Sequence, residues 1–137
     1  MLFRSESTRH RIDSAVEELV QYMLFANEAK LDAPVQGTSG FTEAFQKSGL
    51  RDHKGRSLRD FDLRTRMFRY PLSYMIYTEA FDEMPEAART RIYQRIHDVV
   101  SGKDTAARYA NLNAADRQAI LEILRDTKKT LPAYWKQ

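Results

Sequence analysis

The chain has 137 residues, of which 42% are hydrophobic and 30% are charged, and its formal net charge is +3. This length suits one domain with one core, and the low Gly and Pro content argues against long disorder or a collagen-like repeat. Because the chain contains no cysteine, its own residues cannot form a disulfide, a thiolate zinc site, a c-type haem attachment or a cysteine nucleophile.

No apolar run in the sequence approaches the roughly 20 residues that a membrane-spanning helix needs. The N-terminal sequence MLFRSESTRHR has basic residues but no apolar stretch behind them, so it lacks the order of a secretory signal. As written, the sequence predicts a cytoplasmic protein without a membrane span. If the chain is part of a longer protein, export stays open.

The first predicted helix rests on apolar residues that recur at helical spacing between Ile12 and Leu24. Its start is ambiguous, because Ser14 with Glu17 reads as a capping box, whereas the pattern also extends back towards Ser7. We expect the longer helix, and its wide apolar stripe predicts substantial burial.

The sequence DAPVQGTSG contains a proline and two glycines and predicts a loop after this helix. A short helix is then expected over residues 41–47. Asp52 and Gly55 favour a tight turn, and Ser57 with Asp60 predicts the start of another short helix.

The sequence RTRMFRYPLSYMIYTEAF, residues 64–81, places three arginines in front of a run of aromatic and aliphatic residues. Pro71 suits the first turn of a helix, because its missing N–H would have no partner there. Apolar residues then fall on two sides of the helix: Leu72, Met75, Ile76 and Ala80 on one, and Tyr74, Tyr77 and Phe81 on the other. Since a helix apolar on two sides is central, we expect this stretch to lie mainly in the core.

Glu79 is discordant in this predicted helix, since it projects near Leu72, where an unpaired carboxylate is costly to bury. Arg66 or Arg69 would supply a partner, and we prefer this structural pairing to a catalytic acid. As an alternative, the same residues and Tyr70 would surround an interhelical pocket, either of an enzyme or of a receptor for a small anionic ligand.

Two further helices are predicted in the C-terminal half. One is entered at Pro85 and ended by Gly102, with Arg95 on its polar face, so replacing Arg95 should have little effect. The other is capped at Asn113, and the only tryptophan, Trp135, is expected to lie back across the helices.

No segment alternates with period two, and no internal repeat or linker is visible. The sequence therefore predicts an all-α fold, a compact, irregular bundle of about four main helices plus two or three short ones. Residues 1–137 form a single helical domain in this prediction.

The sequence contains no recognised metal-binding, phosphate-binding or hydrolase motif. The three histidines are scattered without HExxH spacing, the sequence SGKDT lacks the earlier glycine of a phosphate-binding loop, and no GxSxG turn occurs. We therefore predict no catalytic residue, no metal and no cofactor, and do not expect an enzyme.

Charge is distributed unevenly: between Lys47 and Arg69, eight Lys or Arg stand against three Asp, a local excess of +5. Such a cluster can contact phosphates or another polyanion. The preferred interpretation is structural, with the arginines tying an irregular segment to helix ends and carboxylates. The candidate binding residues are Lys54, Arg56, Arg59, Arg64, Arg66, Arg69, Tyr70 and Glu79.

Three stretches, GTSGF, KGRSLRDFDLRTRMFRYPLSYMIY and NLNAADRQAILEILRDTK, resemble the C-terminal portion of larger bacterial proteins of unknown function, some of them exported. The resemblance covers nearly the whole chain and implies an accessory or terminal domain. It assigns no catalytic residue. Where such relatives act with redox or haem domains, it implies docking to one of them.

The preferred function is a non-enzymatic helical interaction or accessory module, with a protein partner or self-association. Polyanion or nucleic-acid binding through residues 47–69 is the first alternative. Binding of a small anionic ligand between helices is the second.

Overall fold

The computed structural model describes residues 6–26, 28 and 39–136; residues 32–38 of the predicted loop lie outside this part. Within it the regular structure is helical, without a β-strand, and an isolated bridge joins Phe61 to Phe68. The long helices are α1 (Glu6–Met23), α2 (Ser39–Lys47), α4 (Glu86–Val100) and α5 (Ala114–Thr127). The short elements are α3 (Glu79–Asp82) and the 3₁₀ turns η1 (Tyr74–Tyr77), η2 (Ala107–Tyr109) and η3 (Ala133–Lys136). The predicted all-α class with four main helices is confirmed.

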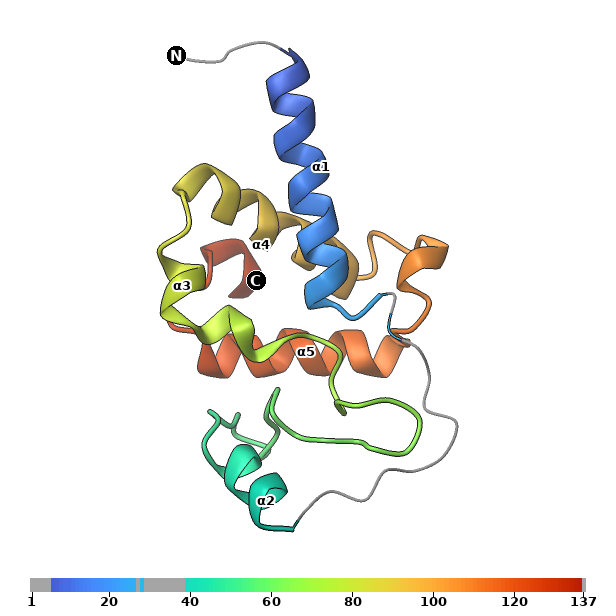
Figure 1. Ribbon diagram of the computed structural model, residues 1–137, viewed down its shortest axis with the longest axis vertical. Coiled ribbons are helices and arrows are strands. Elements are labelled where there is room, and N and C mark those ends of the chain that lie inside the picture. Colours follow the sequence, from blue (N-terminus) through green and yellow to red (C-terminus); the bar gives the residue numbers. More distant parts are fainter. Residues whose placement is uncertain (1–5, 27, 29–38, 137) are drawn as a thin grey trace.

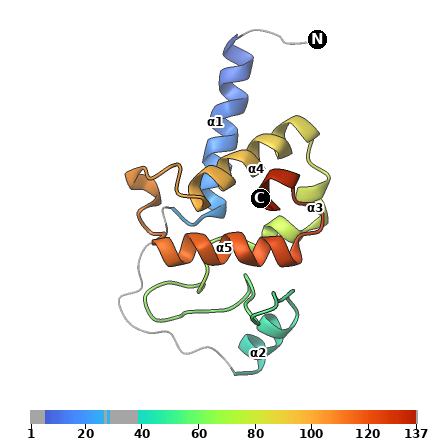
Figure 2. The ribbon, with the colours of Figure 1, turned by 180° about the vertical axis from the view of Figure 1, so that it is seen from behind.

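Helix α5 crosses the middle of the molecule (Figures 1 and 2). Helices α1, α3 and α4 and the C-terminal tail lie on one side of it, and α2 lies on the other. Helix α1 packs on α4, and α4 packs on α5. The N-terminal part of α1 projects away from the rest (Figure 1).

One hydrophobic core joins these elements. Its fully buried side chains include Val20 of α1, Ile96 of α4, Ile123 of α5 and Trp135 of the tail. Leu58, from the basic segment, is also buried in it. The core therefore extends across α5 and supports the segment that holds the candidate residues.

Three helices follow the sequence predictions closely. Helix α1 begins at Glu6, which confirms the longer of the two starts considered. Helix α4 begins directly after Pro85, and Gly102 follows it with a φ of 85°, a conformation that glycine adopts without strain. Asn113 accepts the backbone N–H of Asp116 and completes a capping box at the start of α5.

The predicted continuous helix from Pro71 to Phe81 is wrong, because the chain forms η1 and α3 with a break at Thr78. Thr78 has an extended backbone with ψ of 153°, donates its hydroxyl to Met75 O and accepts the N–H of Phe81. Ser73 caps η1 in the same way by accepting from Met75 N. Short hydroxyl side chains that bond to the nearby backbone compete with a continuous helix.

The core prediction for this stretch survives the break in part. Leu72, Ile76 and Phe81 are buried, Tyr74, Met75 and Tyr77 pack partly buried against the core, and Ala80 is exposed. The prediction for Glu79 is wrong, because this residue is exposed in the first turn of α3. A carboxylate in that position is solvated and complements the free N–H groups of the turn, so it needs no buried partner.

The predicted short helix after Ser57 is also wrong. Ser57 O accepts the N–H of Asp60, and Asp60 Oδ2 accepts the N–H of Ser57, which closes a turn and not a helix. The predicted turn before it is confirmed, because Gly55 N–H donates to Asp52 O and Gly55 has a φ of 81°.

The end of α1 is unusual. Phe25 N–H donates to Tyr22 O and Ala26 N–H donates to Gln21 O, which is the Schellman pattern of a helix C-terminus. The residue in the left-handed position of this pattern is usually glycine, yet here it is Phe25, with a φ of 55°. Its ring stacks on Phe68 with a centroid distance of 5.6 Å. This contact joins the end of α1 to the basic segment and offsets part of the backbone strain.

Candidate interaction surface

The first turn of the basic segment is tied to α5. Arg56 donates to Asp52 Oδ2 from Nε at 2.8 Å and to Glu122 Oε1 from Nη2 at 2.8 Å. Lys54 Nζ lies 3.4 Å from the same oxygen of Glu122. The amide of Gln118, then Arg56 and Lys54, lower the pKa of Glu122 to about 2. Lys54 and Arg56 are therefore engaged with α5.

Asp52 organises this turn from inside. Its Oδ1 accepts the backbone N–H groups of Lys54 and Arg56 at 3.0 and 2.8 Å. Burial raises the pKa of Asp52, but the hydrogen bonds from Arg56 and the backbone outweigh it, so the net shift is downward. His53 beside it contacts Asp126 of α5 through both its backbone N–H and its ring.

Arg66 forms the second tie to α5. Its guanidinium pairs with Asp116 through two hydrogen bonds of 3.0 and 2.9 Å, and Nη2 also donates to Arg69 O at 2.6 Å. The Asp116 hydrogen bonds raise the pKa of Arg66. Because Asp116 also belongs to the α5 capping box, Arg66 connects the basic segment to the start of α5. The predicted pairing of Arg66 with Glu79 is therefore wrong, because the Arg66 guanidinium is bound by Asp116.

The four residues proposed for an interhelical pocket do not form one site. Tyr70 is buried, and the Arg69 guanidinium carbon lies 5.6 Å from the centroid of its ring. In the part of the chain that the structure describes, no ion pair joins Glu79 to Arg66 or Arg69. Arg64 is exposed and stands apart from them in the turn that Asp62 closes.

Arg59 differs from the other candidates, because it packs on aromatic rings. Its guanidinium carbon lies 4.5 Å from the Phe45 centroid and 4.7 Å from the Tyr74 centroid. These two rings belong to a set in which neighbouring centroids lie 5.1 to 6.4 Å apart. We call this set the aromatic cluster: Phe25, Phe41, Phe45, Phe61, Phe68 and Tyr74.

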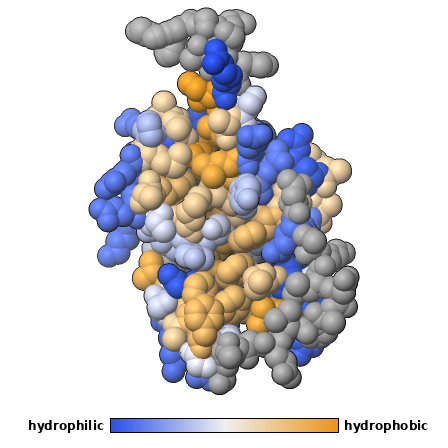
Figure 3. All heavy atoms as spheres, viewed as in Figure 1, coloured by the Kyte–Doolittle hydropathy of each residue, from blue (hydrophilic) through white to orange (hydrophobic). Residues whose placement is uncertain are grey.

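The aromatic cluster is only partly covered. Phe41 is 65% exposed, and the other five members are half-buried. Leu50 and Met67, from the adjoining loops, are 54% and 40% exposed. Figure 3 shows apolar side chains gathered on the α2 end of the molecule. This end therefore combines a fixed aromatic scaffold with apolar side chains that reach water.

Positive charge predominates around the cluster, since the acids of the segment are used internally. Asp60 accepts from Arg51 at 2.9 Å, and Asp62 accepts the backbone N–H of Thr65 at 3.0 Å. The hydrogen bonds of the 64–66 backbone, led by that of Thr65, lower the pKa of Asp62 in spite of partial desolvation. Among the described residues, the cations of this region without an ion pair are Lys47, Arg59, Arg64 and Arg69. Two exposed acids stand against them, Glu43 of α2 and Glu28, which accepts a hydrogen bond from the Met67 backbone.

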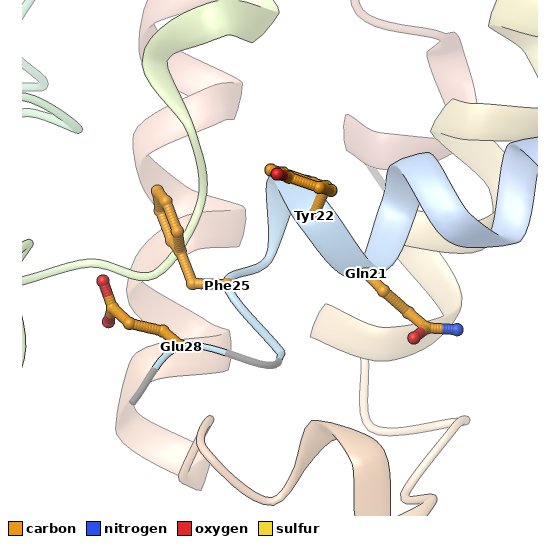
Figure 4. Close-up of a pocket in the computed structure, with 4 residues that line it drawn as sticks. All are labelled: Gln21, Tyr22, Phe25 and Glu28. Carbon is orange, nitrogen blue, oxygen red and sulfur yellow. The ribbon is translucent and has the colours of Figure 1, made fainter. Parts of the chain in front are cut away.

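A pocket of about 330 Å³ lies at the end of α1 and adjoins the aromatic cluster through Phe25; its described lining is Gln21, Tyr22, Phe25 and Glu28 (Figure 4). Figure 4 shows Gln21 pointing away from the side on which Phe25 and Glu28 lie. The polar side chains of its described lining therefore do not converge on one point, as the polar groups of a catalytic or ligand-binding site do.

A charge network on the other side of α5 was missed by the sequence predictions. Arg95 donates to Glu17 at 2.8 Å, to Asp104 at 2.6 Å and to Asp98 at 3.2 Å. Arg95 lowers the pKa of Glu17 against partial burial, and the hydroxyl of buried Tyr109, 2.7 Å away, acts in the same direction. The predicted placement of Arg95 on a solvated face is thus wrong, because three carboxylates bind it. Two of them come from α1 and from the loop after α4, which local sequence does not indicate.

Among the described residues, no three His, Asp or Glu side chains gather so that they could hold a metal ion. None of the helices described is both long and apolar enough to cross a membrane. Comparisons of the chain with protein-family models, curated proteins and solved structures find no match. The function is therefore inferred from the geometry of the chain itself.

Proposed function

We propose that this protein is a non-enzymatic helical interaction module that binds a partner protein through the aromatic cluster. The observation that carries the proposal is the cluster itself, six rings in contact whose outer member, Phe41, is largely exposed. Aromatic side chains held rigidly at a surface bury large apolar areas at a low entropic cost and are enriched at protein interfaces.

The charges around the cluster favour a partner segment that is both apolar and acidic. Lys47, Arg59, Arg64 and Arg69 have no ion pair in the described chain, so an acidic partner would supply the missing anions. An accessory role of this kind, in which the domain docks to another domain or subunit, is also what the resemblance suggested by the sequence would imply.

Capture from native lysate tests this proposal. We expect the wild-type chain to retain a stoichiometric partner, and a Phe41→Ser variant to lose it. Phe41 is exposed enough that this change should leave the fold intact. Tyr22→Ser is the matched control, because Tyr22 is 83% exposed on α1 and lies outside the cluster. Equal capture by Phe41→Ser, or no stoichiometric partner at all, would contradict the proposal.

Polyanion binding is the second candidate, and the unpaired cations Lys47, Arg64 and Arg69 favour it. Arg56 and Arg66 count against it, because their guanidinium groups are already bound by Asp52, Glu122 and Asp116. Binding that depends on phosphate contacts weakens steeply with salt. A single-stranded nucleic acid titrated at low and then at moderate salt separates the two functions, since salt-sensitive binding that survives Phe41→Ser would favour the polyanion.

A further inference from the structure

The pocket beside Arg59 suggests which chemical group of the partner is recognised. We propose that Arg59 binds the carboxylate of an acidic side chain in the partner segment, a role that rests on the interaction function proposed above. Arg59 belongs to the candidate residues predicted from the sequence, but its surroundings set it apart from the others.

The guanidinium of Arg59 is held in place from several directions. The rings of Phe45 and Tyr74 lie against it, with centroids 4.5 and 4.7 Å from Cζ. Its stem fills the space beside Gly49, where an added Cβ would lie 2.6 Å from Arg59 Cδ and 2.8 Å from Ser57 Oγ. A cation fixed in this way loses little freedom when it binds an anion.

The hydrogen-bond donors of this guanidinium have no acceptor in the described chain. Its neighbours along the segment, Arg51, Arg56 and Arg66, are each paired with a carboxylate. Arg59 makes no side-chain hydrogen bond or ion pair within the described chain, and Asp60 next to it already binds Arg51. An arginine has five N–H donors in a planar fork, a shape that matches a carboxylate.

The pocket that Arg59 lines has a volume of about 150 Å³. Sites for whole small molecules occupy roughly 300–1,000 Å³, so this one suits a side chain. Three hydroxyls of its wall are engaged elsewhere: Ser48 donates to Phe45 O, Tyr77 bonds to Thr127, and Thr78 donates to Met75 O. Within the described chain, the lining side chains with donors to spare are therefore the Arg59 guanidinium and the Tyr74 hydroxyl, and Arg59 alone carries a charge. A single cation in a small pocket favours a carboxylate over a phosphate, which usually requires several arginines.

Titration of the full chain with 3-phenylpropionate, followed by ¹H–¹⁵N NMR, tests the site. We expect saturable shifts at the Gly49 amide and Arg59 Nε, with a dissociation constant on the order of 1 mM for a ligand of this size. The neutral analogue 3-phenylpropionamide should bind at least about tenfold more weakly, because it lacks the charge. Equal binding of acid and amide would overturn the proposal, and this comparison needs no variant.

Variants and a second anion sharpen the test. Arg59→Gln should abolish the shifts, whereas Arg64→Gln, which removes an exposed arginine of the same segment, should leave them unchanged. Inorganic phosphate that binds more tightly than 3-phenylpropionate at the same residues would contradict the assignment to a carboxylate. Because no partner protein is used, failure here removes the Arg59 site and leaves the Phe41 capture result standing.

Discussion

The surroundings of Arg95 and of Arg59 show two opposite uses of an arginine. Arg95 donates to three carboxylates, from α1, from α4 and from the loop after α4. Arg59 lies in the most basic segment of the sequence and contacts two rings and, within the described residues, no carboxylate. Charge density along the chain therefore does not reveal which cations remain open to a partner. The folded neighbours decide it.

The loop that follows α4 adds to this contrast. Arg117 of α5 donates to the carbonyl oxygens of Val99, Asp104, Tyr109 and Leu112. A single guanidinium thus satisfies the end of α4 and the loop after it. The α4 side is closed by internal hydrogen bonds, whereas the α2 side ends in half-exposed rings.

The largest expected effect comes from Ile76→Asp, because Ile76 belongs to the hydrophobic core on which both the Arg95 network and the aromatic cluster rest. Ile76 is fully buried in η1, and an unpaired charge there should destabilise the fold by several kcal/mol. Thermal unfolding followed by circular dichroism measures the change. An unchanged melting temperature would show that this stretch does not lie in the core.

Arg95→Ala removes the charge network on the α4 side and leaves the aromatic cluster unchanged. It leaves Glu17 and Asp104 without their main cation, and we expect a loss of about 1–2 kcal/mol, since these groups are only partly buried. Arg91→Ala is the control, because Arg91 pairs with Asp13 where both are well exposed, and should cost less than about 0.5 kcal/mol. Urea unfolding of both variants checks the difference. If both variants lost a similar amount of unfolding free energy, Arg95 would contribute no more than an exposed arginine.

Gly49→Ala perturbs the surroundings of Arg59, beside the aromatic cluster, without changing any charge. The new methyl group would overlap the stem of Arg59 and Ser57 Oγ, so the arginine must move, at a cost of about 1 kcal/mol. Gly40→Ala in α2 meets no atom within 4 Å and should stabilise by about 0.5 kcal/mol. Chemical denaturation gives both values. A neutral Gly49→Ala would mean that Arg59 is not held where we describe it.

The smallest expected effect is the acid dependence of the tie between α5 and the basic segment. The pKa of Glu122 is about 2 in the fold against an ordinary 4.5, so its stabilisation is full above pH 4.5 and is lost as the pH falls towards 2. Glu122→Gln should reduce the slope of the unfolding free energy in this range by up to about one proton. Glu18→Gln, an exposed acid of α1, should leave the slope unchanged. Equal slopes for both variants would indicate that Glu122 is not engaged.

Much of the fold could be predicted from the sequence, because α1, α4 and α5 combine helical periodicity with clear end signals. Asn113 and Asp116 are one such signal, and Gly102 is another. The stretch before α4 could not be predicted in the same way. Its apolar spacing fits a helix, but Ser73 and Thr78 bond to the backbone beside them and divide it. Local hydrogen bonds outweighed periodicity there.

The candidate surface was predicted less well. Composition identified the basic segment, but Glu122 and Asp116, the acids of α5 that bind Arg56 and Arg66, lie 66 and 50 residues away from them in the sequence. The rings of the aromatic cluster do not recur at a regular sequence spacing, since they come from the end of α1, from α2, from the segment after α2 and from η1. One signal was present: five of the seven phenylalanines lie between Phe25 and Phe68. Such a concentration between the end of α1 and the start of η1 indicates a second centre of packing.

The acids of α5 have one more consequence. Asp116, Glu122 and Asp126 all touch the 53–66 stretch, so this helix acts as a built-in counterion for it. Converting the three acids to amides would double the net charge of +3 and set free the cations that they now hold. The chain would then become a general binder of nucleic acids and anionic membranes. Which cations of this segment remain unpaired therefore depends as much on the acids of α5 as on the basic residues themselves.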